Sequence, residues 1–152
     1  MKCSVRASVV ADIYELASGL RAGDRAEVEA LGVSPQIGIR RSFRQAILRK
    51  TYFVDGEIAA MSGLCGAMLS DIGEPYLMTT PAAAKMPVTF VRMARHAIGE
   101  MLAHRARLEG YVAAEYRGAV RLLEVLGFSL GEPTAIGPHG ALFRSFTLMR
   151  VR

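Results

Sequence analysis

Residues 51–63 read Thr-Tyr-Phe-Val-Asp-Gly-Glu-Ile-Ala-Ala-Met-Ser-Gly, and they carry the clearest structural signal in the chain. Asp55-Gly56 is a two-residue turn of the kind that joins antiparallel strands. The flanking segments, Leu48–Val54 and Glu57–Leu69, are apolar enough to form the two strands. We therefore expect a β-hairpin near the middle of the chain.

A short strand and three helices are expected before this hairpin. The strand is Lys2–Arg6, and Val10–Leu20 follows it with apolar residues at helical spacing. Asp24–Leu31 begins with a potential N-cap at Asp24, and Glu27 stands three residues on, as in a capping box. The third helix opens at Ser34-Pro35, with serine as N-cap and proline at the first helical position.

After the hairpin, strands alternate with helices and a second hairpin closes the chain. We expect strand Pro75–Thr80, an irregular segment Pro81–Met86, helix Pro87–Arg107, strand Leu108–Ala114, helix Arg117–Leu126, and paired strands Phe128–Leu130 and Leu142–Arg150. Hairpins and one β-α-β crossover in one chain predict a mixed sheet. The expected fold class is α+β of α/β type, with a mixed, mostly antiparallel sheet flanked by helices on both faces.

Length and composition limit the possible functions. The 152 residues are enough for a single domain, residues 1–152, and 51% apolar with 22% charged residues is typical of a soluble globular protein. The net charge of +5 favours anionic ligands. The chain has two cysteines, which are too few for a disulfide scaffold, and no Cys/His spacing is typical of a metal site. A reducing, intracellular setting fits this cysteine content best. The longest uncharged stretch, Ile58–Ser70, is too short to cross a membrane.

This order of elements resembles the GNAT superfamily of acyl-CoA-dependent N-acyltransferases, and three stretches carry the resemblance. Residues 51–63 look like the second and third strands of that family. Strand Tyr76–Thr80 and the long helix from Pro87 occupy the place of its acyl-CoA-binding strand and pyrophosphate loop. Residues 115–128 resemble its late signature, with matches at Ala119, Glu124, Gly127 and Phe128.

A narrower resemblance involves Leu20–Gly32, which is similar to the "LR-x-x-D-x-x-E" segment of small GNAT-like proteins of tailed bacteriophages. Some proteins of that group are acetyltransferases, and others are internal virion (core) proteins. The resemblance therefore implies two functions. One is acetyl transfer from acetyl-CoA to a primary amine, and the other is a catalytically inactive virion or interaction protein. The implied location is the cytoplasm of the host cell or the phage virion.

The resemblance also implies where acetyl-CoA would bind. The pantetheine arm would follow the backbone of Met78, Thr79 and Thr80, and the pyrophosphate would meet Ala83, Ala84, Lys85 and Met86 at the start of the long helix. The chain departs from the family pattern here, because residues 81–87 contain no glycine. The alternative is that Tyr76–Thr80 is only a central strand and Lys85 a surface charge.

Two candidate catalytic residues are Tyr116 and Glu27. Leu123 stands where the family often has the tyrosine that protonates the departing thiolate, and leucine cannot act as a general acid. Tyr116 could replace that tyrosine, although a packing role is the alternative. Glu27 lies in the region that borders the family's acceptor channel and could bind or deprotonate an amine, unless it only completes a capping box.

The implied partner is a small-molecule or protein amine. A homodimer, which the C-terminal segment Leu142–Val151 could form as in GNAT relatives, and virion proteins are further possible partners. Membrane partners are not expected. The basic cluster of Arg40, Arg41 and Arg44 could serve as a nucleic-acid patch, but few aromatic residues interleave it. The sequence therefore favours a solvated helix face over a nucleic-acid interface.

Overall fold

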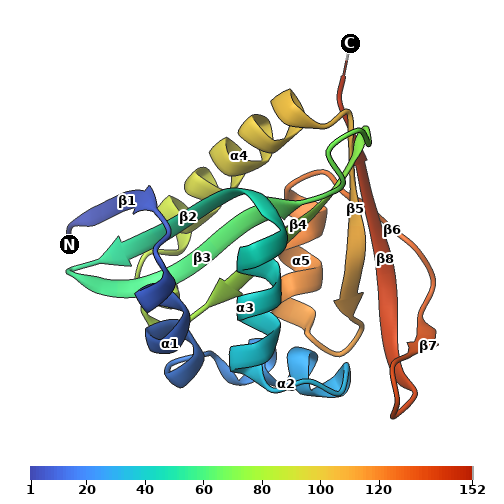
Figure 1. Ribbon diagram of the computed structural model, residues 1–152, viewed down its shortest axis with the longest axis horizontal. Coiled ribbons are helices and arrows are strands. Elements are labelled where there is room, and N and C mark those ends of the chain that lie inside the picture. Colours follow the sequence, from blue (N-terminus) through green and yellow to red (C-terminus); the bar gives the residue numbers. More distant parts are fainter. Residues whose placement is uncertain (152) are drawn as a thin grey trace.

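The computed structural model describes residues 1–151 (Figure 1). The elements are β1 (Cys3–Ala7), α1 (Val10–Ser18), α2 (Ala22–Ala30), α3 (Pro35–Gln45), β2 (Ala46–Val54), β3 (Glu57–Cys65), β4 (Ile72–Thr79), the 3-10 helix η1 (Pro81–Lys85), α4 (Pro87–His104), β5 (Arg107–Ala113), α5 (Arg117–Val125), β6 (Ser129–Leu130), β7 (Thr134–Ile136) and β8 (Ala141–Met149).

These strands form one sheet in the order β1-β2-β3-β4-β5-β8-β6, and β7 also pairs with β8. Every pair is antiparallel except β4 and β5, which the crossover helix α4 connects in parallel. The hairpin turn forms as expected, with Asp55 and Gly56 both at positive φ. The mixed, mostly antiparallel sheet confirms the expected fold class.

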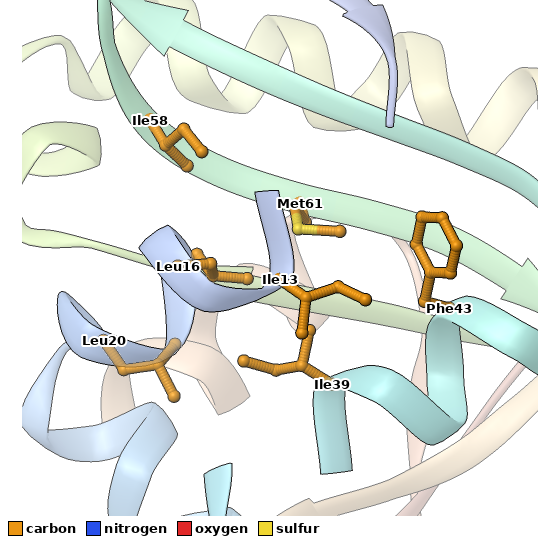
Figure 2. Close-up of a cluster of buried hydrophobic side chains, with 7 residues drawn as sticks. All are labelled: Ile13, Leu16, Leu20, Ile39, Phe43, Ile58 and Met61. Atoms are coloured by element: carbon orange, nitrogen blue, oxygen red, sulfur yellow. The ribbon is translucent and has the colours of Figure 1, made fainter. Parts of the chain in front are cut away.

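Helices cover both faces of the sheet. α1 and α3 pack on one face through a buried apolar cluster (Figure 2): Ile13, Leu16, Leu20, Ile39, Phe43, Ile58 and Met61. α4 and α5 share a second cluster on the other face, around Leu64, Leu108 and Phe146. The apolar stripes of the helices therefore give the sheet its two covering layers.

β4 and β5 separate soon after they begin. Only Ile72 with Arg107 and Gly73 with Leu108 are in register, and beyond these pairs the two strands diverge toward Thr79 and Ala113. Figure 1 shows this V-shaped opening, with α2 at its wide end. The separation leaves facing strand edges without their usual partners, and such edges bind other extended chains.

Several boundaries differ from those expected. β3 ends at Cys65 rather than Leu69, and α4 ends at His104 rather than Arg107. The segment expected to be irregular forms η1, and the expected loop between the last two strands contains the short strand β7. Two of these differences are element ends, which local patterns determine least, and η1 and β7 are too short to give a periodic pattern.

Candidate active site

A cavity of about 640 Å³ occupies the space where β4 and β5 diverge. α2, α4 and α5 supply further walls, and most of the lining side chains are apolar. Of the residues expected to bind the cofactor, Met78, Thr79, Ala83, Ala84 and Met86 line the cavity, as do the candidate catalytic residues Glu27 and Tyr116. The structure therefore brings together residues that are up to about ninety positions apart in the sequence.

Helix α2 bridges the wide end of the opening. On the β4 side, the Asp24 carboxylate accepts hydrogen bonds from the Thr79 hydroxyl at 2.5 Å and the Thr79 amide at 3.3 Å. On the β5 side, the Glu27 carboxylate accepts a hydrogen bond from the Ala113 amide at 2.9 Å. The expected capping box is therefore wrong: Arg21 is the N-cap of α2, and both acids bind distant strands instead.

Glu27 has the electrostatic properties of a base that works near neutral pH. The pKa of its carboxyl is raised to about 7, mainly by burial and to a smaller extent by the nearby charge of Asp24, while the hydrogen bond from Ala113 acts in the opposite direction. A carboxyl with a pKa near 7 exchanges protons readily at physiological pH. Its pKa and its position in the cavity make Glu27 the strongest candidate base in the site.

Tyr116 lies at the start of α5, against α2. Its hydroxyl donates a hydrogen bond to Asp24 at 3.1 Å, so Asp24 links Tyr116 to Thr79. The ring packs on Gly23, where a Cβ atom would come within 2.5 Å of ring carbon Cε1. Burial and the charge of Asp24 raise the pKa of Tyr116 to about 12, so the phenol keeps its proton at neutral pH.

Two further polar side chains line the cavity where β4 leaves β5. Glu74 directly follows the last residue of β4 that pairs with β5. Burial raises the pKa of its carboxyl, and so does the charge of Glu109, the corresponding residue of β5. The Tyr76 hydroxyl is buried with no hydrogen-bond partner within residues 1–151, and its ring lies over Gly63. In the sequence, Glu74 is a charged residue beside a mostly apolar segment, which could have indicated a functional role. No local pattern singles out Tyr76.

The expected pyrophosphate region is built differently from a glycine loop. The Thr80 side chain caps η1 by accepting a hydrogen bond from the Ala82 amide at 3.3 Å, and it donates to the Ile58 carbonyl at 2.7 Å. Thr80 and Lys85 are not among the cavity-lining residues. Lys85 Nζ instead lies 3.8 Å from Glu57 Oε2, near the surface.

Positive charge at the cavity comes from other sources. α4 begins at Pro87, and the first-turn amides of a helix have no partners within it, which favours anions at that end. Pro87, Thr89 and Met86 all line the cavity, so this helix end faces it. Arg21 and Arg121 line it as well. A ligand with both an anionic group and an apolar arm matches this distribution.

Within residues 1–151, no group of three or more His, Cys, Asp or Glu side chains is arranged to hold a metal ion. His96 instead lies 3.0 Å from Glu100, one turn along α4, and Glu100 also binds Lys50 at 2.6 Å. Over the same residues, no helix is both long and apolar enough to cross a membrane.

Nearly the whole chain matches acetyltransferases of known structure in its fold. The chain has the GNAT fold. A GNAT-family acetyltransferase from Streptococcus pneumoniae matches 99% of this chain and 100% of its own length, with a TM-score of 0.65 at 12% identity. An N-acetyltransferase from Staphylococcus aureus matches 98% of this chain and 99% of its own, with a TM-score of 0.70 at 11% identity.

A third structure with the GNAT fold is the spermidine N-acetyltransferase from Vibrio cholerae in complex with CoA and spermine. It matches 97% of this chain and 95% of its own length, with a TM-score of 0.70 at 14% identity. The sequence itself matches no family model and no curated protein. At these identities the structural matches establish the GNAT fold alone.

Proposed function

We propose that this protein is an N-acyltransferase that moves an acyl group from acyl-CoA to a primary amine. The observation that carries the proposal is the cavity at the diverging strands, with a carboxyl of pKa about 7 on its wall. An acid of this pKa in a mostly apolar cavity is suited to taking a proton from an ammonium group. The GNAT fold supports the same reaction by analogy.

The cavity fits acyl-CoA as the second substrate. The exposed edges of β4 and β5 can hydrogen-bond the two amides of a pantetheine arm as an added strand would. Met78 and Thr79 stand along that path, and Ala83, Ala84 and Met86 stand at the end nearest α4. The N-terminus of α4, with Arg21 or Arg121, would hold the phosphates.

In the proposed reaction, Glu27 accepts a proton from the ammonium group, which leaves a neutral amine. The amine nitrogen then forms a bond to the thioester carbonyl carbon, and the bond from that carbon to sulfur breaks. The thiolate takes a proton as it leaves, which makes free CoA. The nitrogen gives up its extra proton to replace the one that the donor lost, which makes the amide, and Glu27 releases its own proton to water. Tyr116 holds a proton at neutral pH and is the proposed donor, once its hydroxyl turns from Asp24.

Carboxylates support an amine as the acceptor. Glu27 and Glu74 both line the cavity, and neither forms an ion pair within residues 1–151. A cationic amine would offset their charge, since opposite charges favour each other strongly in partly buried sites. The acceptor is therefore proposed to be a small-molecule or protein amine that binds as its ammonium form.

A second candidate function is a catalytically inactive phage virion or interaction protein with the GNAT fold. One observation favours it: the amides of Ala82 and Ala83 bind Thr80, so they are unavailable to a pyrophosphate. Leu123, in the cavity wall, also lacks the proton that a tyrosine would supply. Assembly with virion proteins belongs to this alternative, whereas a homodimer is compatible with either function.

Release of free thiol from acetyl-CoA tests the proposal, with a panel of polyamines, amino acids and peptides as acceptors. We expect at least one amine to raise thiol release well above the hydrolysis rate, with a matching acetylated product by mass spectrometry. A folded protein that releases no thiol with any acceptor, and that binds no CoA, would favour the inactive alternative.

A further inference from the structure

The cavity extends beyond the diverging strands into the apolar core between α4 and α5. Six buried or half-buried residues line this part, which we call the inner chamber: Ala97, Met101, Val112, Leu123, Phe128 and Phe146. All six belong to the apolar cluster on that face, and none carries a polar side chain. Leu64 and Leu108, in the same cluster, do not line the cavity and are fully buried.

The Met101 end of the chamber lies farther from the start of α4 than a pantetheine arm that follows this helix would reach. Pro87 and Met101 both line the cavity and are about four helical turns apart, or about 21 Å along the helix axis. A pantetheine arm has about thirteen bonds in its backbone, and its extended length is about 15 Å from standard bond geometry. With the phosphates at the start of α4, about 6 Å of apolar cavity remains beyond the sulfur.

An acetyl group would leave that space unfilled. Apolar space inside a core loses the dispersion contacts that packed atoms would make, and water does not occupy it readily without polar partners. An aliphatic chain of about four to six carbons would fill the remaining length. The chemistry that suits the chamber is therefore a hydrocarbon chain attached to the thioester.

We propose that the inner chamber selects acyl donors with a short to medium aliphatic chain, such as butyryl-CoA or hexanoyl-CoA, over acetyl-CoA. This inference rests on the proposed function, because it assigns the acyl group of the same reaction. The reaction itself is unchanged: the amine nitrogen gains the acyl carbon, the carbon–sulfur bond breaks, the thiolate takes a proton from the donor, and the proton that the nitrogen loses replaces it. Ala97 and Met101 lie on successive turns of α4, and they would limit the length of the acyl chain.

Isothermal titration calorimetry of the full chain with CoA, acetyl-CoA, butyryl-CoA and hexanoyl-CoA tests the proposal without an acceptor. Each buried methylene should tighten binding by about fourfold at most. Because ordering the chain offsets part of this gain, we expect hexanoyl-CoA to bind at least tenfold more tightly than acetyl-CoA. Ala97→Leu places extra carbon atoms in the chamber. It should weaken the binding of hexanoyl-CoA at least tenfold more than the binding of acetyl-CoA.

Ala103→Leu is the matched control, since Ala103 is exposed on the same helix and does not line the cavity. It should leave the preference for hexanoyl-CoA intact. If Ala97→Leu does not fold, Ala119→Leu is the second variant, because Ala119 on α5 lines the same cavity and packs against the cluster that forms the chamber. Equal affinities for acetyl-CoA and hexanoyl-CoA would overturn the chain-length proposal alone. Failure of every form of CoA to bind would overturn the proposed function as well.

Discussion

Replacing Glu27 with glutamine should make the folded protein more stable above neutral pH and remove its activity. The pKa of the buried carboxyl is raised from 4.5 to about 7, which corresponds to about 3 kcal/mol against the ionised form in the folded state. Below pH 4.5 the carboxyl is protonated in both the folded and the unfolded state. As the pH rises to about 7, the unfolded state loses its proton first, and the folded state loses stability relative to it.

Glutamine stays neutral and keeps an acceptor oxygen for the Ala113 amide. At pH 8, Glu27→Gln should therefore raise the free energy of unfolding by up to about 3 kcal/mol. For a domain of this size, that is a rise in Tm of about 6–12 °C. At pH 4.5 the rise should shrink toward zero, since the wild-type carboxyl is then mostly protonated.

Activity should change in the opposite direction. Loss of a general base lowers kcat by about 10²–10⁴-fold. In the wild type, kcat/KM should rise with pH through about 7 as Glu27 ionises, and this limb should be absent from the variant. Glu29→Gln is the matched control, because Glu29 is exposed on the same helix. If the Tm of Glu27→Gln at pH 8 is equal to or below that of the wild type, the argument from burial is refuted. If the activity of Glu27→Gln is within threefold of the wild type, Glu27 is not the base in the reaction.

Three further substitutions test the roles of Tyr116 and Lys85. Tyr116→Phe should lower kcat by about 10²-fold or more with little change in KM, because it removes the proton donor and keeps the ring on Gly23; an unchanged kcat in steady-state assays would assign Tyr116 to packing. Lys85→Glu should weaken CoA binding by about threefold to tenfold in calorimetry at low salt, and less at high salt, as for an exposed charge. Glu57→Gln removes the carboxylate next to Lys85 and should strengthen CoA binding. Equal affinities for CoA in the wild type, Lys85→Glu and Glu57→Gln would place Lys85 outside the phosphate site.

The sequence predicted the fold well where signals are local. Asp55-Gly56 gave the hairpin, Ser34-Pro35 gave the start of α3, and Gly127 at positive φ follows α5 as expected. The Ser34 side chain accepts a hydrogen bond from the Ile37 amide, as an N-cap does. Each of these features depends on neighbours a few residues away, so a pattern in the sequence can specify it.

The site was harder to predict because its contacts are long-range. Asp24 and Glu27 have the spacing of a capping box, yet Asp24 binds Thr79 and Glu27 binds Ala113. Spacing along a helix does not show which strand the helix will face. The resemblance singled out Glu27 and Tyr116, and both line the cavity, but the contacts of Asp24 with Thr79 and Tyr116 follow only from the fold. Glu74 and the inner chamber likewise depend on how far β4 and β5 diverge.

Thermal melting with and without millimolar CoA tests the central claim, that the opening between β4 and β5 binds acyl-CoA. A ligand at about 100-fold above its Kd stabilises the folded state by about 2.7 kcal/mol, which predicts a rise in Tm of about 5–11 °C. Ala84→Glu, at an exposed residue of the cavity wall, should abolish that rise and leave the Tm without ligand nearly unchanged. A folded wild-type protein whose Tm does not move with CoA would contradict the account.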